Sequence, residues 1–85
     1  MSDILIVDDN RIMADVVRFN LERSGYTVTV AENGRVAADL VQIKQFDFII
    51  TDYQMPEMNG EVFCRFLRQN ARHANVPVLM CSAKG

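Results

Sequence analysis

The chain has 85 residues and a formal net charge of −2 at pH 7; 49% of its residues are hydrophobic and 24% are charged. This composition is typical of one folded globular domain and excludes a disordered chain, and the charge provides no basic surface for nucleic acid. No apolar run approaches the roughly 20 residues that cross a bilayer, which excludes a membrane-spanning helix.

The first half of the chain predicts two strands, each followed by a helix. Residues 4–7 form a continuous apolar run, which is typical of a strand buried on both faces. Asn10 is a suitable N-cap for an amphipathic helix over residues 11–24. The apolar positions of this helix are Met13, Val16, Val17 and Leu21. Residues 26–31 alternate threonine and valine, as an edge strand does, and Asn33-Gly34 turns the chain into a helix over residues 36–43.

The second half repeats this alternation. Residues 46–51 form an apolar strand that ends at Asp52, residues 61–71 form a helix, and Pro77 opens a last strand over 78–82. The inward positions of that third helix are Val62, Phe63, Phe66 and Leu67. Alternating strands and helices predict a parallel sheet covered by helices. With the alternating second strand at the edge, we expect a three-layer, doubly wound α/β fold of the flavodoxin-like kind, with strand order 2-1-3-4.

Acidic residues follow two strands that such a sheet places side by side. Asp8 and Asp9 follow the first strand and Asp52 ends the third, so we expect their carboxylates to converge at one edge. Carboxylates this close repel one another unless a cation is present, and Mg²⁺ prefers oxygen ligands together with a phosphate. Asp52 can then act as a nucleophile that forms an acyl phosphate. Ser82, which ends the fourth strand, can donate a hydrogen bond to a phosphoryl oxygen.

Three segments together resemble the response-regulator receiver domain of bacterial two-component signalling: ILIVDDN, IITDYQMPEMNG and VPVLMCSA. The resemblance extends over residues 1–85. It implies that Asp52 is the phosphoacceptor and that Ser82 is the switch hydroxyl. It also implies an Mg²⁺ site whose ligands are Asp8, Asp9, Asp52 and the backbone carbonyl of Gln54. The implied donor is a sensor histidine kinase or a phosphotransfer protein, and the domain phosphorylates and dephosphorylates only itself.

Receiver domains also have a fifth strand with an invariant lysine, whereas this sequence ends at Gly85. We therefore expect an incomplete receiver domain over residues 1–85, with the fifth strand absent and the fourth strand left as a bare edge. Association through that edge, as a homodimer, is the expected consequence. One alternative is a truncated receiver scaffold that folds or dimerises without accepting a phosphoryl group.

Two other function classes fit the sequence less well. Aspartyl-phosphate phosphatases usually carry a second acid two residues after the nucleophile, and Gln54 occupies that position here. A flavin- or nucleotide-binding module of the same topology would have a glycine-rich or hydroxyl-rich loop after the first strand, where this chain has two acids.

Several side chains outside these motifs have simpler interpretations. Cys64 and Cys81 lack metal-ligand spacing, so we expect two buried, reduced thiols in a cytoplasmic protein. His73 is expected at the surface with no role in the site. Arg65, Arg68 and Arg72 fall on one side of the third helix, which predicts a solvated face.

Overall fold

The computed structural model describes residues 2–53 and 58–81, which form four strands and three helices. In chain order they are β1 (Asp3–Val7), α1 (Arg11–Arg23), β2 (Thr27–Ala31), α2 (Gly34–Ile43), β3 (Phe48–Asp52), α3 (Gly60–Arg68) and β4 (Val78–Cys81). All the strand pairings are parallel, and the order across the sheet is β2-β1-β3-β4. The predicted flavodoxin-like α/β fold and its strand order are confirmed.

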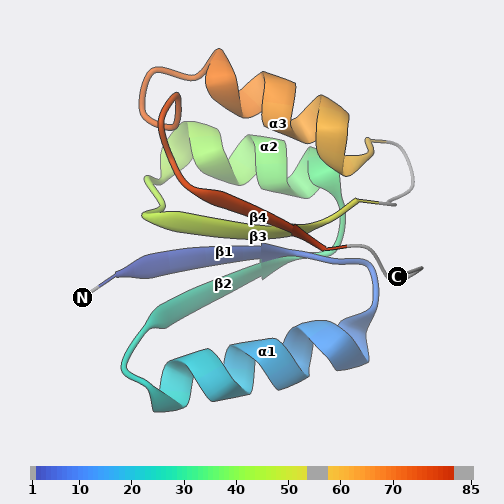
Figure 1. Ribbon diagram of the computed structural model, residues 1–85, viewed down its shortest axis with the longest axis vertical. Helices are drawn as coiled ribbons and strands as arrows, with labels where there is room; N and C mark the ends of the chain where they lie inside the picture. The colour runs from blue at the N-terminus through green and yellow to red at the C-terminus, as the bar shows by residue number, and fades with distance from the viewer. Residues whose placement is uncertain (1, 54–57, 82–85) are drawn as a thin grey trace.

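The sheet separates two hydrophobic cores, and Figure 1 shows α1 on one side of it and α2 with α3 on the other. Alternate side chains of a strand point to opposite faces, so β1 supplies both cores, which explains its continuous apolar run. The core under α2 and α3 consists of Leu5, Val7, Ala31, Ala37, Val41, Phe46, Ile49, Phe63, Leu67 and Val76. The smaller core under α1 consists of Ile4, Ile6 and Ala14.

Asparagine side chains start all three helices. Asn10, Asn33 and Asn59 each accept a hydrogen bond at Oδ1 from the backbone N–H three residues later, at distances of 2.8 to 3.1 Å. Such caps satisfy N–H groups that have no partner within the helix. Asn10 was predicted as a cap, whereas Asn33 was predicted only as a turn residue. Gly25 ends α1 with a φ of 97°, in the left-handed region that glycine adopts easily.

The outer strands differ from the two inner ones. β2 is a partly exposed edge strand, as its alternating pattern predicted. In the described part of the chain β4 pairs with β3 alone, and Leu79 is 51% exposed. Within the same ranges, no helix combines the length and the apolar character that spanning a membrane requires.

The structure corrects several expectations about burial. Met13 and Val16 are more than half exposed and Val62 is exposed too, because each helix turns a narrower apolar face to the sheet than its sequence pattern indicated. The two free thiols are not buried: Cys64 is partly exposed and Cys81 is exposed.

One further expectation fails near the end of α3. His73, predicted at the surface, is fully buried. Arg68 is exposed, as predicted, and its guanidinium also donates hydrogen bonds to three backbone carbonyls of the following segment.

Candidate metal centre at the carboxyl edge of the sheet

Asp8 and Asp9 lie where β1 leaves the sheet and the chain turns toward α1. The Asp8 N–H donates to the carbonyl of Ala31 at 3.0 Å, which extends the pairing with β2 by one residue beyond the strand. Asp8 Oδ1 accepts the N–H of Asn10 at 2.8 Å. Because Asn10 also caps α1, the Asp8 side chain is tied to the start of that helix. Asp8 is partly buried and Asp9 is exposed.

Asp52 is the last residue of β3 and lies between β1 and β4. It pairs with Cys81 of β4, and the next N–H, that of Tyr53, donates to the Cys81 carbonyl at 2.8 Å. On the other side, the Gly60 N–H donates to the Tyr53 carbonyl at 2.8 Å. The backbone around Asp52 is therefore held both by β4 and by the start of α3.

Gly60 has a second role in this arrangement. A Cβ added to Gly60 would lie 2.8 Å from the carbonyl oxygen of Asp52 and 3.0 Å from the Cα of Tyr53. Both neighbours are backbone atoms, which cannot move aside as a flexible side chain can. The absence of a side chain thus lets α3 begin directly against the end of β3.

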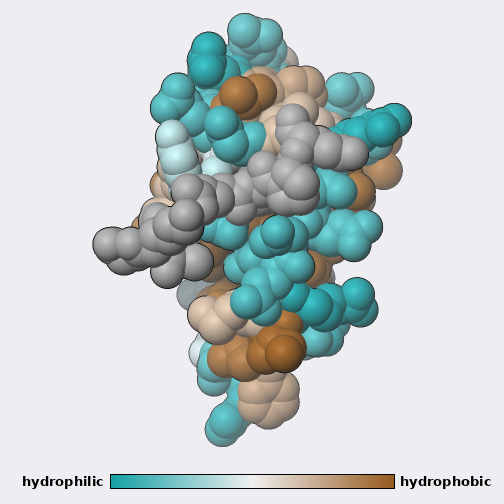
Figure 2. Space-filling view, turned by 90° about the vertical axis from the view of Figure 1, so that its right-hand side faces the viewer, coloured by the Kyte–Doolittle hydropathy of each residue, from teal (hydrophilic) through white to brown (hydrophobic). Residues whose placement is uncertain are grey.

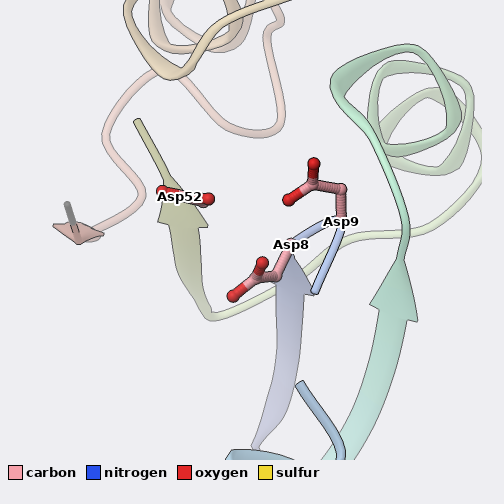
Figure 3. Close-up of side chains that lie close together, drawn as sticks. All are labelled: Asp8, Asp9 and Asp52. Atoms are coloured by element: carbon pink, nitrogen blue, oxygen red, sulfur yellow. The ribbon is translucent and has the colours of Figure 1, made fainter. Parts of the chain in front are cut away.

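The three carboxylates form one group, which we call the acidic cluster (Asp8, Asp9 and Asp52). One oxygen from each lies within 4.8 Å of the others, and Figure 3 shows them gathered above the ends of β1 and β3. Burial raises the pKa of Asp8 above its ordinary value, and the negative charges of Asp52 and Asp9 add to this effect. The N–H of Asn10 opposes it by stabilising the charged form.

The chemistry of these donors indicates which cations would fit. All three side chains offer carboxylate oxygens, the ligands that hard cations such as Mg²⁺ and Ca²⁺ prefer. A divalent cation would also offset the repulsion that raises the pKa of Asp8. The acidic cluster therefore suits a hard divalent cation better than zinc or copper, which favour nitrogen and sulfur ligands.

A hollow of about 490 Å³ adjoins the acidic cluster on the side of α1. Its lining residues come from the β1–α1 turn, α1, the end of β2 and the start of α2: Asp8, Asp9, Arg11, Asp15, Arg18, Val30, Glu32 and Val36. Two members of the acidic cluster, Asp8 and Asp9, are thus reachable from this side by a ligand larger than a water molecule.

The predicted convergence of Asp8, Asp9 and Asp52 is what the geometry shows. Gln54 and Ser82 lie outside the described residues. Two features were missed from the sequence. Asn10 supports Asp8 through its backbone, which the Asp-x-Asn spacing could have indicated, because an aspartate often accepts the N–H two residues later. Cys81 lies beside Asp52 on the neighbouring strand, and only the strand register reveals that.

Comparison with known proteins places the chain in a family. Residues 4–85 match the family model described as the response regulator receiver domain. The chain is 40% identical over 85 residues to the DNA-binding dual master transcriptional regulator RpaA of Synechocystis sp., covering 100% of this chain and 35% of that protein. It is 37% identical over 81 residues to the alkaline phosphatase synthesis transcriptional regulatory protein PhoP of Bacillus subtilis, covering 95% of this chain and 33% of that protein.

Solved structures agree with this placement. The chemotaxis response regulator CheY4 of Vibrio cholerae superposes with a TM-score of 0.92 at 36% identity, over 94% of this chain and 67% of that one. A signal receiver domain from Syntrophus aciditrophicus superposes with a TM-score of 0.89 at 35% identity, over 94% of this chain and 61% of that one. The chain spans about a third of the length of the two curated relatives. It belongs to the response regulator receiver domain family, whose members are signalling domains.

Proposed function

We propose that this chain is the phosphoacceptor domain of a bacterial two-component response regulator, and that Asp52 accepts the phosphoryl group. The observation that carries the proposal is the acidic cluster itself, in which three carboxylates lie within 4.8 Å of one another at the carboxyl edge of the sheet. Open α/β sheets bind their ligands at this edge. Family membership supports the same assignment.

Mg²⁺ is the cation that we assign to this cluster. Asp8, Asp9 and Asp52 would hold it, together with the backbone carbonyl of Gln54, which the family resemblance implies. When bound, Mg²⁺ would neutralise charge on the transferring phosphoryl group.

In the proposed reaction, a carboxylate oxygen of Asp52 attacks the phosphorus of a phosphohistidine. A new P–O bond forms, the P–N bond breaks, and the released imidazole takes up a proton. The hydrogen bonds that Tyr53 makes with Cys81 and Gly60 hold the end of β3 still during this transfer. The Ser82 hydroxyl would donate to a phosphoryl oxygen, and water would later hydrolyse the acyl phosphate.

The exposed side of α1 suits a protein donor. Ile12, Met13, Val16 and Phe19 form an apolar surface, the α1 patch, in which Ile12 is 77% exposed and Phe19 is 59% exposed. Figure 2 shows apolar side chains over α1 on the view that faces the carboxyl edge of the sheet. Because α1 begins two residues after Asp9, a sensor histidine kinase or phosphotransfer protein that presents a histidine to Asp52 would also cover this patch.

One experiment tests the acceptor and the metal together. The protein is incubated with Mg²⁺ and acetyl phosphate, and its intact mass is followed over time. We expect the mass to rise by one phosphoryl group, and we expect no rise without Mg²⁺. Asp52→Asn should abolish the rise, whereas Asp39→Asn, the same change at an exposed position on α2, should leave it unchanged.

The other outcomes are equally informative. Phosphorylation that persists in Asp52→Asn would contradict the proposal. Mg²⁺ binding without any mass change would favour the receiver scaffold that does not accept a phosphoryl group. The homodimer through β4 and the cytoplasmic location remain predictions, and light scattering at several protein concentrations tests the first of them.

A further inference from the structure

A second polar cluster lies at the opposite end of the sheet and plays no part in the proposed reaction. Its centre is His73, in the α3–β4 segment (residues 69–77), and the exposed fraction of His73 is 0%. Burying a titratable ring is costly unless its nitrogen atoms find partners. Both ring nitrogens of His73 do so, and the partners come from two different parts of the chain.

The first partner determines the state of Nε2. The Phe46 N–H, just before β3, donates to His73 Nε2 at 3.0 Å across 27 residues of sequence. A backbone N–H can only donate, so Nε2 must carry a lone pair and no proton. The hydrogen bond itself thus requires a neutral ring.

The second partner determines the state of Nδ1 independently. Asn70 Oδ1 lies 3.0 Å from His73 Nδ1 and also accepts the Arg72 N–H at 3.0 Å. Because Arg72 supplies a backbone donor, the Asn70 atom that faces the ring is the oxygen. Nδ1 must therefore donate to it. Both contacts require the same neutral tautomer, with the proton on Nδ1.

The backbone carbonyls of the His73 segment already accept hydrogen bonds from a cation. Arg68 Nη1 donates to the carbonyls of His73, Ala74 and Val76 at 3.3, 3.2 and 2.9 Å. On its other side the imidazole packs against the Phe46 ring, with 6.2 Å between ring centroids. A proton added at Nε2 would point directly at the Phe46 N–H, and two donors would then face each other in a buried place.

The nearby charges also disfavour a charged ring. Arg68 and Arg72 belong to the same part of the chain as His73, and Lys44 lies 5.6 Å above the Phe46 ring. The acid of the segment that leads into β3 is Asp47, whose carboxylate accepts the Asp3 N–H at 2.8 Å. Lys44 is paired with the Asp3 carboxylate at 3.4 Å, whereas the charge of Arg72 disfavours a protonated ring.

We propose that His73 is a pH-sensitive latch: its neutral ring holds the α3–β4 segment against the start of β3, and its protonation releases that segment. The first hydrogen bond between β3 and β4 lies directly after the latch, from the Ile49 N–H to the Pro77 carbonyl at 3.0 Å. The far end of β4 pairs with Asp52. Acidification would therefore loosen the strand that flanks the acidic cluster.

The direction of the pH effect follows from the burial. Burial lowers the pKa of His73 below its ordinary value of 6.5, and the charge of Arg72 lowers it further. Above pH 6.5 the ring is neutral in both the folded and the unfolded chain, and the latch contributes its full stability. As the pH falls from 6.5 toward the lowered value, only the unfolded chain takes up the proton. The folding equilibrium constant then falls by up to about tenfold per pH unit.

The latch can be tested directly, because His73 is the one histidine in the sequence. Long-range ¹H–¹⁵N NMR spectra of the imidazole, recorded on the native chain during a pH titration, report both the tautomer and the pKa. We expect the Nδ1–H tautomer and titration below pH 6.5. The Nε2–H tautomer, or titration at or above the ordinary value, would overturn the proposal.

A variant separates the latch from other titrating groups. In His73→Gln the side-chain oxygen can still accept the Phe46 N–H, but it does not titrate. Urea unfolding of both proteins is measured from about pH 7.5 to about pH 5. We expect the folding constant of the native chain to fall relative to that of the variant by up to about tenfold per pH unit. Parallel pH profiles would contradict the latch, and the NMR titration decides the matter if the variant does not fold.

Discussion

The two ends of the sheet both hold titratable groups, but these groups are satisfied to different degrees. At the carboxyl edge three carboxylates crowd within 4.8 Å of one another, and Asp9 is exposed. At the other end His73 is fully buried and each ring nitrogen has its own partner. The first end holds three carboxylates whose like charges a cation can neutralise. At the second end both nitrogens of the buried ring already have hydrogen-bond partners. The candidate binding site in this molecule is therefore the group of polar side chains that carry like charges, and not the group whose members pair with one another.

Removing the imidazole should have the largest effect on stability. His73→Leu would leave the buried Phe46 N–H without its acceptor and Asn70 Oδ1 without the ring donor, because leucine can neither accept nor donate a hydrogen bond. We expect the free energy of unfolding to fall by about 3 kcal/mol at neutral pH. Urea denaturation measures this value. A loss no greater than that of an exposed substitution such as Asp39→Asn would show that the two hydrogen bonds contribute little.

A cation should stabilise the carboxyl edge by a comparable amount. If the acidic cluster holds Mg²⁺ only in the folded chain, a concentration about a hundredfold above Kd should raise the free energy of unfolding by about 2.7 kcal/mol. Thermal unfolding with increasing Mg²⁺ measures this effect. Asp9→Asn should reduce it strongly, whereas His73→Gln should not. An equal response in the Asp9→Asn variant would place the cation elsewhere.

Gly60→Ala should disturb the carboxyl edge without touching any charge. The added methyl group would lie 2.8 Å from the Asp52 carbonyl oxygen, so the start of α3 or the end of β3 must shift. We expect a loss of about 2 kcal/mol in the free energy of unfolding, together with slower phosphorylation of Asp52 by acetyl phosphate. Gly25→Ala is the comparison, because its strain is purely conformational and lies far from the site. It should destabilise the chain without slowing phosphorylation of the folded protein.

The smallest expected effect has the opposite sign. Asp8→Asn removes a partly buried charge that two other carboxylates repel, so the Mg²⁺-free protein should become more stable by up to about 1 kcal/mol at pH 7. Because the pKa of Asp8 is raised in the folded chain, the destabilising effect of its charge is absent below the ordinary value of 3.8. It develops as the pH rises from 3.8 toward the raised pKa of the folded chain, and it is complete above that pKa. Urea unfolding in the presence of a chelator checks this gain, and destabilisation at pH 7 would show that the Asn10 contact outweighs the repulsion.

The fold and the acidic cluster were both predictable because they depend on local patterns. The apolar run of residues 4–7 and the alternation of residues 26–31 distinguished an inner strand from an edge strand. Once those positions in the sheet were assigned, Asp8, Asp9 and Asp52 had to meet at its carboxyl edge. The roles of Gln54 and Ser82 stay predictions, since both lie outside the described residues.

The second polar cluster could not be predicted in the same way. Nothing near His73 in the sequence indicates burial, and its decisive partner, the Phe46 N–H, is 27 residues away. The hydrogen bonds of Arg68 were missed for a related reason, because they go to backbone carbonyls, which carry no signal of residue type. The exposure of Met13 and Val16 was missed because helical spacing shows that an apolar face exists but not how much of it the sheet covers.

The sequence by itself determined the order of strands and helices, the asparagine cap at Asn10, and the edge at which three acids would gather. These features follow from hydrophobic periodicity and chain direction, which can be read from a few neighbouring residues at a time. Only the tertiary structure decided that Cys81 lies beside Asp52, that Gly60 must have no side chain, and that His73 is buried in one tautomer. Each of these depends on the register and packing of segments far apart in the chain, which no local pattern encodes.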